Sequence, residues 1–464
     1  MVTSFVIFLL VFVAIGVSSV RFSRGSGTDY YLASRSVQSW LVGLSAVATN
    51  NSGYMFIGVI GYTYATGLAS IWLMIGWILG DLAASLYVHR RLQKASADFS
   101  QDSFPGAIAN WDGVLRPAAQ RLAALIALLF LTAYATAQLV AGSKALFVIL
   151  EWPIWSGAVL GAVMVAAYCM AGGIRASIWT DAAQSFVMIF AMALLLFVAV
   201  DSLGGPASAW QQMGQIPGFL DLFPSDLPLP GLAGGVLFAL GWLFAGFSVV
   251  GQPHIMVRFM ALDQKQSLVV ARSWYYLWFT LFYFAATGVG MLSRIYLNNP
   301  ADFDAELALP TMALQLLPDL GVGLVLAGLF AATISTADSL ILSASAALTR
   351  DLKSSLSENT RYIKLVTLLV TLFALILALS NTQSVFDLVI FAWSTMASAF
   401  APVMLVHCRG GNPGQRTLIA MMLVGAGTAI GWRLLGWNGF VYEGLPGILA
   451  GFIPWWISRA LQRG

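Results

Sequence analysis

Long runs of apolar residues alternate along the chain with short stretches that hold most of its charged residues. Each run is close to the ~20 residues that an α-helix needs to cross the hydrocarbon core of a bilayer. We predict thirteen transmembrane helices, with bounds good to about 2 to 4 residues, at 3–20, 39–66, 69–89, 120–148, 153–172, 176–200, 231–257, 270–297, 319–348, 362–380, 384–407, 416–436 and 444–460. The pattern therefore predicts an all-α polytopic membrane protein.

The basic residues support this count, because Lys and Arg gather in the cytoplasmic loops of membrane proteins. With thirteen helices, every Lys and Arg except Lys144, Arg294 and Arg433 falls at one face. The predicted outer loops are 201–230, which has three acids and no base, and 298–319. One helix more or fewer would distribute the Lys and Arg residues over both faces of the membrane. We therefore expect the N-terminus outside and the C-terminus in the cytoplasm.

The composition agrees with a membrane protein, since 59% of the residues are hydrophobic, 9% are charged and the mean hydropathy is +0.82. Cys169 and Cys408 fall in or beside apolar runs, so we predict no disulfide framework. The net charge of +3 comes from basic residues in loops, and we expect no nucleic-acid partner. The histidines are far apart in sequence and no HExxH or GxSxG motif occurs, so we expect no enzyme.

One predicted transmembrane helix carries many polar residues in the part that would lie inside the bilayer. It reads GLFAATISTADSLILSASA at 328–346, and a single helical face collects Ala332, Ser335, Thr336, Asp338 and Ser339. A carboxylate at the centre of a span costs about 2.5 to 3.5 kcal/mol even on lenient insertion scales. Hydroxyl and carboxylate oxygens are the ligands that hard cations prefer. A lone Ser or Thr often serves helix packing instead, but this cluster favours a cation site.

Two other predicted helices are interrupted near their middles. The first has the sequence NNSG at 50–53, and irregular backbone at membrane depth is tolerated where protein or a cavity covers it. The other contains Gly251 and Pro253, which free backbone carbonyls at a similar depth. Once the first helix is set aside, the interruptions fall in helices one and six. Matching interruptions predict two five-helix inverted repeats around a midplane binding site.

Several stretches carry a family resemblance. They are YYLASRSVQSW (30–40), SAVATNNSGY (45–54), YATAQLVAGSKALF (134–147), AGGIRASIWTDAAQ (171–184), GQPHIMVRFMA (251–261), ATISTADSL (332–340) and FAWSTMASAFAP (391–402). Together they resemble the sodium/solute symporter family, and most closely its sodium/proline symporter branch. The resemblance covers nearly the whole chain, and AGGIRASIWTDAAQ followed by GQPHIMVRFMA is highly specific.

The resemblance implies a leucine-transporter-like fold within a single transmembrane domain, 1–464. An extra helix and an inner loop occupy 1–38, the first inverted repeat 39–203, the second repeat 231–407 and two further helices 408–464. It also implies a bacterial inner membrane as the location. We expect a monomer.

The resemblance further implies a first sodium site between the interrupted helix and the polar helix. Its ligands would be the carbonyls of Ala48, Asn51 and Ala332 and the hydroxyls of Ser335 and Thr336. The residue types alone already single out the two hydroxyls.

A second sodium site is implied for some members of the family. There, an acid at the position of Asp181 joins side chains that match Ser335, Asp338 and Ser339. The alternative for Asp181 is an acid at the helix end that pairs with Arg175.

The organic solute is expected at the same depth as the interruptions. The N–H groups near Ser52 and Gly53 suit a carboxylate, because the start of a half-helix favours an anion. Further candidates for the walls and gates of this site are Tyr134, Gln138, Trp242, Phe247 and Phe391.

Two features depart from the proline branch: Asn50 stands where an acid is typical, and LGWLFAGFSVVGQPH does not keep the aromatic spacing. We therefore predict sodium-coupled symport of a small organic solute by alternating access, with an amino acid such as proline as the first candidate. The alternatives are sodium- or proton-coupled transport of another solute, such as a carboxylate or a sugar, and a membrane sensor with a transporter-like fold.

Overall fold

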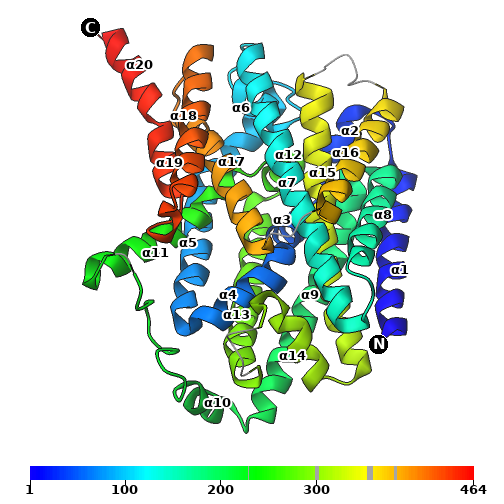
Figure 1. Ribbon diagram of the computed structural model, residues 1–464. Helices are drawn as coiled ribbons and strands as arrows, with labels where there is room; N and C mark the ends of the chain where they lie inside the picture. The colour runs from blue at the N-terminus through cyan, green and yellow to red at the C-terminus, as the bar shows by residue number, and fades with distance from the viewer. Residues whose placement is uncertain (228, 298–302, 353–358, 381–383, 464) are drawn as a thin grey trace.

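The computed structural model describes residues 1–227, 229–297, 303–352, 359–380 and 384–463, which form a bundle of helices (Figure 1). The helices are α1 (Val2–Ser18), α2 (Gly27–Leu32), α3 (Ser39–Gly53), α4 (Ile60–Thr66), α5 (Ile71–Asp98), α6 (Phe104–Ala109), α7 (Pro117–Leu150), α8 (Trp155–Gly172), α9 (Ile174–Ser202), α10 (Pro206–Met213), α11 (Gly231–Phe247), α12 (Pro253–Ala261), α13 (Leu268–Tyr296), α14 (Ala308–Leu316), α15 (Asp319–Ala346), α16 (Thr360–Ser380), α17 (Val385–Cys408), α18 (Gln415–Leu434), α19 (Gly444–Gly451) and α20 (Ile453–Arg463). One isolated bridge pairs Val37 with Leu262. The long helices follow the apolar runs, which confirms the all-α prediction for this part of the chain.

The two ends of the bundle hold different segments (Figure 1). The C-terminus lies at the end with α2 and α6, and the N-terminus lies at the end with α10 and α14. Termini at opposite ends agree with an odd number of crossings. The side that faces the cytoplasm stays a prediction from the charge pattern. Two parts of that pattern, Lys353 and residues 298–302 of the second predicted outer loop, lie outside the described residues.

Eleven segments of the described residues are long and apolar enough to cross a membrane. The expected count of thirteen is therefore not confirmed, and two places account for the difference. The segment Ser39–Asp98 counts once, although Gly67, with a φ of 63°, separates α4 from α5. The predicted last helix, 444–460, is divided between the short helices α19 and α20.

The helices pack in two groups with α3 between them. On one side α5, α11 and α13 pack together, and on the other α7, α8, α15 and α16 do so. A Cβ at Gly80 or Gly246 would clash with the backbone of the facing helix, so these two glycines allow α5 and α11 to approach closely. On α15, every residue from Val325 to Ala346 is buried, which places the polar face of this helix in the protein interior.

Both predicted interruptions are present. Ser52 adopts φ 37° and ψ 173° at the end of α3, and a π-helical segment, η3 (Tyr54–Val59), follows. The second interruption consists of a 3₁₀ turn, η5 (Ser248–Gly251), and the extended Gln252, after which Pro253 starts α12. Both breaks therefore leave backbone groups free of regular helical pairing in the interior.

Candidate functional site

The backbone groups that the break in α3 leaves free are hydrogen-bonded to nearby side chains. The Oγ of Ser52 accepts a hydrogen bond from the N–H of Tyr54 (3.1 Å) and another from the hydroxyl of Tyr134 (3.3 Å). The N–H of Gly53 donates to Oε1 of Gln138 (2.8 Å). A non-glycine residue in the conformation of Ser52 costs about 1 to 3 kcal/mol and persists where its surroundings hold it there. The break is thus fixed by side chains of α7.

Gly53 lies where α3 approaches two other helices. A Cβ at this position would meet Cγ2 of Thr333 at 2.6 Å, Oε1 of Gln138 at 3.0 Å and Cβ of Ala141 at 3.1 Å. Thr333 belongs to α15, and the other two belong to α7. A side chain at residue 53 would therefore push these helices away from the break.

Hydroxyl groups of α15 contact backbone carbonyls of α3 directly before the break. Ser335 Oγ donates to the carbonyls of Ala48 (3.2 Å) and Ala332 (3.1 Å), and Thr336 Oγ1 donates to the carbonyl of Thr49 (2.8 Å). All five residues are fully buried. Four predicted ligands of the first sodium site thus come together, and the structure adds the Thr49 carbonyl to them.

Asn51, the fifth predicted ligand, lies one turn away from this contact. Its carbonyl accepts from the N–H of Tyr54 at the end of α3. Its side-chain Oδ1 is buried and has no hydrogen-bond partner among the described residues. Asn51 therefore offers a free side-chain acceptor in addition to the predicted carbonyl.

A second polar cluster adjoins the first on α9 and α15. Ser177 Oγ contacts Oδ1 of Asp338 (2.9 Å) and Oδ2 of Asp181 (3.4 Å), and Ser339 Oγ donates to Oδ1 of Asp338 (2.9 Å). Ser45 of α3 donates to Oδ2 of Asp181 (2.7 Å). Asp181, Asp338 and Ser339, the predicted residues of the second sodium site, therefore lie in one network.

Arg258 fills the centre of this second cluster, which the sequence analysis did not predict. Its Nη2 pairs with Oδ2 of Asp181 at 3.2 Å and also contacts Ser177 (2.9 Å) and Ser339, while its Nε donates to Ser45 (3.2 Å). The charge pattern had assigned Arg258 to the inner face. The structure instead buries it, because every residue of α12 is buried. The available signal was the pair of acids at membrane depth, since buried charges are paired.

The alternative partner predicted for Asp181 binds a different carboxylate. Arg175 forms its ion pair with Asp29 of α2 at 2.6 Å. Asp181 is thus an interior acid and not the cap of its own helix. One oxygen of each carboxylate, Oδ1 of Asp181 and Oδ2 of Asp338, is buried without a partner among the described residues. These oxygens are free to accept a cation or a proton.

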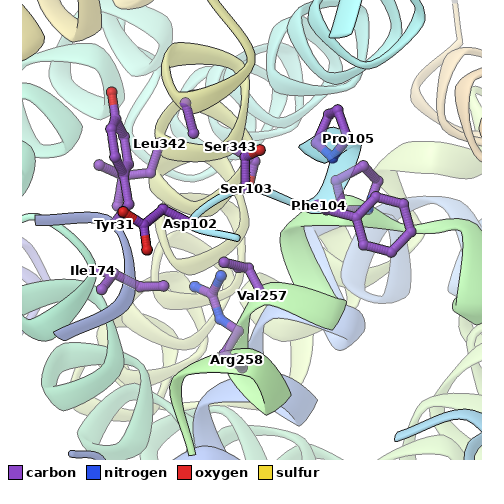
Figure 2. A pocket seen from close by; sticks show the side chains of 12 residues that line it. Tyr31, Asp102, Ser103, Phe104, Pro105, Ile174, Val257, Arg258, Leu342 and Ser343 are labelled. Carbon is purple, nitrogen blue, oxygen red and sulfur yellow. The ribbon is translucent and has the colours of Figure 1, made fainter. Parts of the chain in front are cut away.

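A pocket lies on the α6 side of Arg258. Figure 2 shows the Arg258 side chain extending from α12 into this pocket, whose other walls carry Tyr31, Asp102, Ser103 and Leu342. Asp102 accepts from Thr28 (2.5 Å) and forms ion pairs with Arg350 (3.3 Å) and Arg35 (3.7 Å). These contacts join three separate segments of the chain beside the pocket.

The predicted solute residues fall into two sets. Ser52, Gly53, Tyr134 and Gln138 meet at the break, as described above. The aromatic candidates lie elsewhere: Trp242 packs on Tyr62 (5.5 Å between ring centroids), Phe391 packs on Phe130 (5.6 Å), and Phe247 lines a groove with Tyr87, Leu405 and Trp455.

His254 is a further polar side chain of the second break. It is fully buried at the start of α12, and neither ring nitrogen has a partner among the described residues. Its ring lies edge-on to Tyr134, with 5.4 Å between centroids. Nε2 of Gln138 is also buried without a partner. The second break therefore contributes a free polar side chain near the first.

A family model described as the sodium:solute symporter family matches residues 30–408. The chain is 31% identical to the sodium/proline symporter of Escherichia coli K12, over 98% of this chain and 91% of that protein. It is 29% identical to the high-affinity proline transporter PutP of Bacillus subtilis 168, over 92% and 91% of the two chains.

Solved structures show the same fold. A Na⁺-coupled sialic acid symporter, in a substrate-bound outward-open state, superposes with a TM-score of 0.83 at 18% identity, covering 99% of this chain and 97% of that one. Mhp1, a nucleobase-cation-symport-1 family transporter, superposes with a TM-score of 0.58 at 14% identity, covering 93% and 95%. Both likenesses concern the fold alone.

Proposed function

This chain belongs to the sodium:solute symporter family, in which a solute moves together with sodium, and we propose that the solute of this protein is proline. Two relatives with about the full length of the chain bear the name of proline transporters. The predicted ion is a hard cation, and the interior cluster offers the oxygen ligands that such cations prefer. The solute assignment rests on those relatives and on the polar break in α3.

The contact between α3 and α15 carries the proposal for the first ion. We propose that the carbonyls of Ala48, Asn51 and Ala332 and the hydroxyls of Ser335 and Thr336 bind sodium. In support, the hydroxyls of Ser335 and Thr336 already face carbonyls of α3 at 3.2 and 2.8 Å. These groups are neutral and buried, and none of them is hydrogen-bonded to a basic side chain among the described residues.

A second ion would bind at Asp181, Asp338 and Ser339. Two carboxylates and one guanidinium leave one negative charge when both acids are ionised, and a buried net charge is strongly unfavourable. The free oxygens of Asp181 and Asp338 support this site. Arg258 would then share the carboxylates with the ion or move away from them.

The solute would bind at the break of α3. We propose that Ser52, Gly53, Tyr134 and Gln138 form its polar end, since they already contact one another there. Nε2 of Gln138 suits a carboxylate, and Oδ1 of Asn51 suits an ammonium group, because each has no partner among the described residues. Trp242, Phe247 and Phe391 would act as walls or gates in another conformation.

The energetics allow concentrative uptake by alternating access. One sodium ion entering through ~100 mV releases about 2.3 kcal/mol, and a tenfold sodium gradient adds about 1.4 kcal/mol. Their sum corresponds to roughly several-hundred-fold accumulation of the solute. We propose that sodium binding at α3 orders the break, after which the solute binds and the two groups of helices rock.

Uptake of labelled proline into proteoliposomes tests this function. We expect accumulation with an inward sodium gradient and none with an equal potassium gradient. Accumulation driven by a pH gradient without sodium would overturn sodium coupling. If sodium raises the unfolding temperature of the purified protein but proline is not taken up, the ion assignment holds. Uptake of other labelled amino acids, carboxylates and sugars then identifies the solute.

A further inference from the structure

A carboxylate outside both clusters lies in the middle of α5. Asp81 is fully buried, and its oxygens accept hydrogen bonds from the hydroxyls of Tyr275 (2.6 Å) and Tyr276 (2.7 Å) and from Nδ2 of Asn50 (3.2 Å). All three donors are neutral. None of the ion pairs among the described residues includes Asp81. The network suits the ionised carboxylate, because all its members donate to it.

The basic groups near Asp81 are engaged elsewhere. Arg272, one turn before Tyr276 on α13, donates to the carbonyl of Ser85. His89, two turns further along α5, stacks on Phe259 of α12. When Asp81 is ionised, its negative charge has no basic side-chain partner among the described residues. In a low-dielectric interior such a charge attracts a mobile cation much more strongly than it would in water.

Asn50 links this charge to the proposed sodium site. Its side-chain amide donates to Asp81, while its backbone directly follows Thr49, whose carbonyl accepts from Thr336. Asn50 also donates to the hydroxyl of Tyr275, so two members of the Asp81 network hold this part of α3. The carboxylate thus lies one side chain away from the carbonyls that face α15.

We propose that Asp81 is a positioning residue for the coupling ion, whose negative charge strengthens sodium binding at the contact between α3 and α15. This inference rests on the proposed sodium site. Both oxygens of Asp81 already have partners, so Asp81 acts from a distance and not as a ligand. Asn50 keeps the charge close to α3 and orients the carbonyl of Thr49.

The experiment removes the charge and then returns it to the neighbouring helix. Asp81→Asn keeps the shape but loses the charge, and the double exchange Asp81→Asn with Asn50→Asp moves the carboxylate onto α3. Sodium affinity is measured without solute, by binding of ²²Na⁺ to the purified protein and by the sodium-dependent rise in its unfolding temperature. Asp351→Asn is the matched control, because Asp351 is buried and also accepts from neutral donors, Ser103 and Gln120.

We expect Asp81→Asn to weaken sodium binding about tenfold, which is about 1.4 kcal/mol, and the exchange to recover most of that loss. Asp351→Asn should bind sodium like the unaltered protein. Unchanged affinity in folded Asp81→Asn would overturn the proposal. Weak binding that the exchange does not restore would also overturn it, because Asp81 would then act through hydrogen bonds alone.

The outcomes separate this inference from the proposed function. If the unaltered protein shows no response to sodium, the sodium site itself fails. If Ser335→Ala weakens sodium binding and Asp81→Asn does not, only the role of Asp81 fails. Should Asp81→Asn not fold, the exchange decides: sodium binding by a folded exchange variant supports the proposal, and failure of both variants to fold or bind sodium overturns it.

Discussion

The two polar clusters that meet α3 differ in how their charge is balanced. Around Ser335 and Thr336, hydroxyls face backbone carbonyls, and every group is neutral. Around Asp181 and Asp338, two carboxylates face the guanidinium of Arg258. A neutral oxygen cluster gains positive charge when an ion enters it, whereas the charged cluster already holds a cation of the protein. The first cluster is thus the better candidate for a mobile ion.

The difference also follows from the two breaks in the chain. The break in α3 supplies carbonyls to α15, while the helix that starts at the second break, α12, supplies Arg258 to α9. Each break therefore brings a different kind of group to neighbouring positions. Movement of α12 relative to α9 would change the charge balance of the second cluster and leave the first cluster neutral.

The largest effect is expected when the charged cluster loses its cation. Arg258→Gln leaves two buried carboxylates without a counterion, and breaking a buried pair in this way costs about 3 to 5 kcal/mol. We expect little folded protein and a much lower unfolding temperature in detergent. Size-exclusion profiles and thermal unfolding measure this effect.

A double substitution tests whether Arg258 is the counterion of the buried carboxylates. Arg258→Gln combined with Asp181→Asn removes one charge of each sign, so most of the lost stability should return. If Arg258→Gln still folds, and sodium raises its lowered unfolding temperature to that of the unaltered protein, then a bound ion can replace the guanidinium. A fully stable Arg258→Gln that does not respond to sodium would contradict the role of Arg258 as the counterion.

The second effect concerns the neutral cluster. Ser335→Ala or Thr336→Ala removes a hydroxyl that faces a carbonyl of α3, and we expect sodium activation of transport to weaken by about tenfold or more, equal to about 1.4 kcal/mol. The protein should still reach the membrane, because no charge is left unpaired. The sodium concentration for half-maximal uptake measures this change.

Ser345→Ala is the matched control for these variants. Ser345 is also a buried hydroxyl of α15, but it contacts Tyr31 and Thr367 instead of α3. Its loss should leave sodium activation unchanged. Equal sodium dependence in Ser335→Ala, Thr336→Ala and the unaltered protein would rule out the proposed first site.

The sequence predicted the neutral cluster better than the charged one. The NNSG stretch and the spacing of Ser335 and Thr336 depend on local chemistry, which the sequence records directly, and both features are confirmed as a break and a buried contact. Arg258 was misplaced because its burial depends on the tertiary position of the short helix α12. The rings of Trp242 and Phe391 could not be placed either, since aromatic packing depends on neighbours that are remote in sequence.

The ion pair between Asp29 and Arg175 gives the smallest expected effect. It tests whether burial sets how much stability is lost when one partner of an ion pair is removed. Asp29 pairs with Arg175 near the end of the bundle, with 13% of the Arg175 side chain exposed. Burial raises the pKa of Asp29, but the N–H of Arg24, the hydroxyl of Ser34 and the guanidinium of Arg175 outweigh it and hold this pKa below its ordinary value. Such a depressed pKa contributes stability above the ordinary pKa, and this stability is lost as the pH falls through the folded-state pKa. We therefore expect Asp29→Asn to lower the unfolding temperature at pH 7 modestly, and the gap from the unaltered protein to narrow toward acidic pH. A loss as large as that of Arg258→Gln would show that burial is not what distinguishes the two ion pairs.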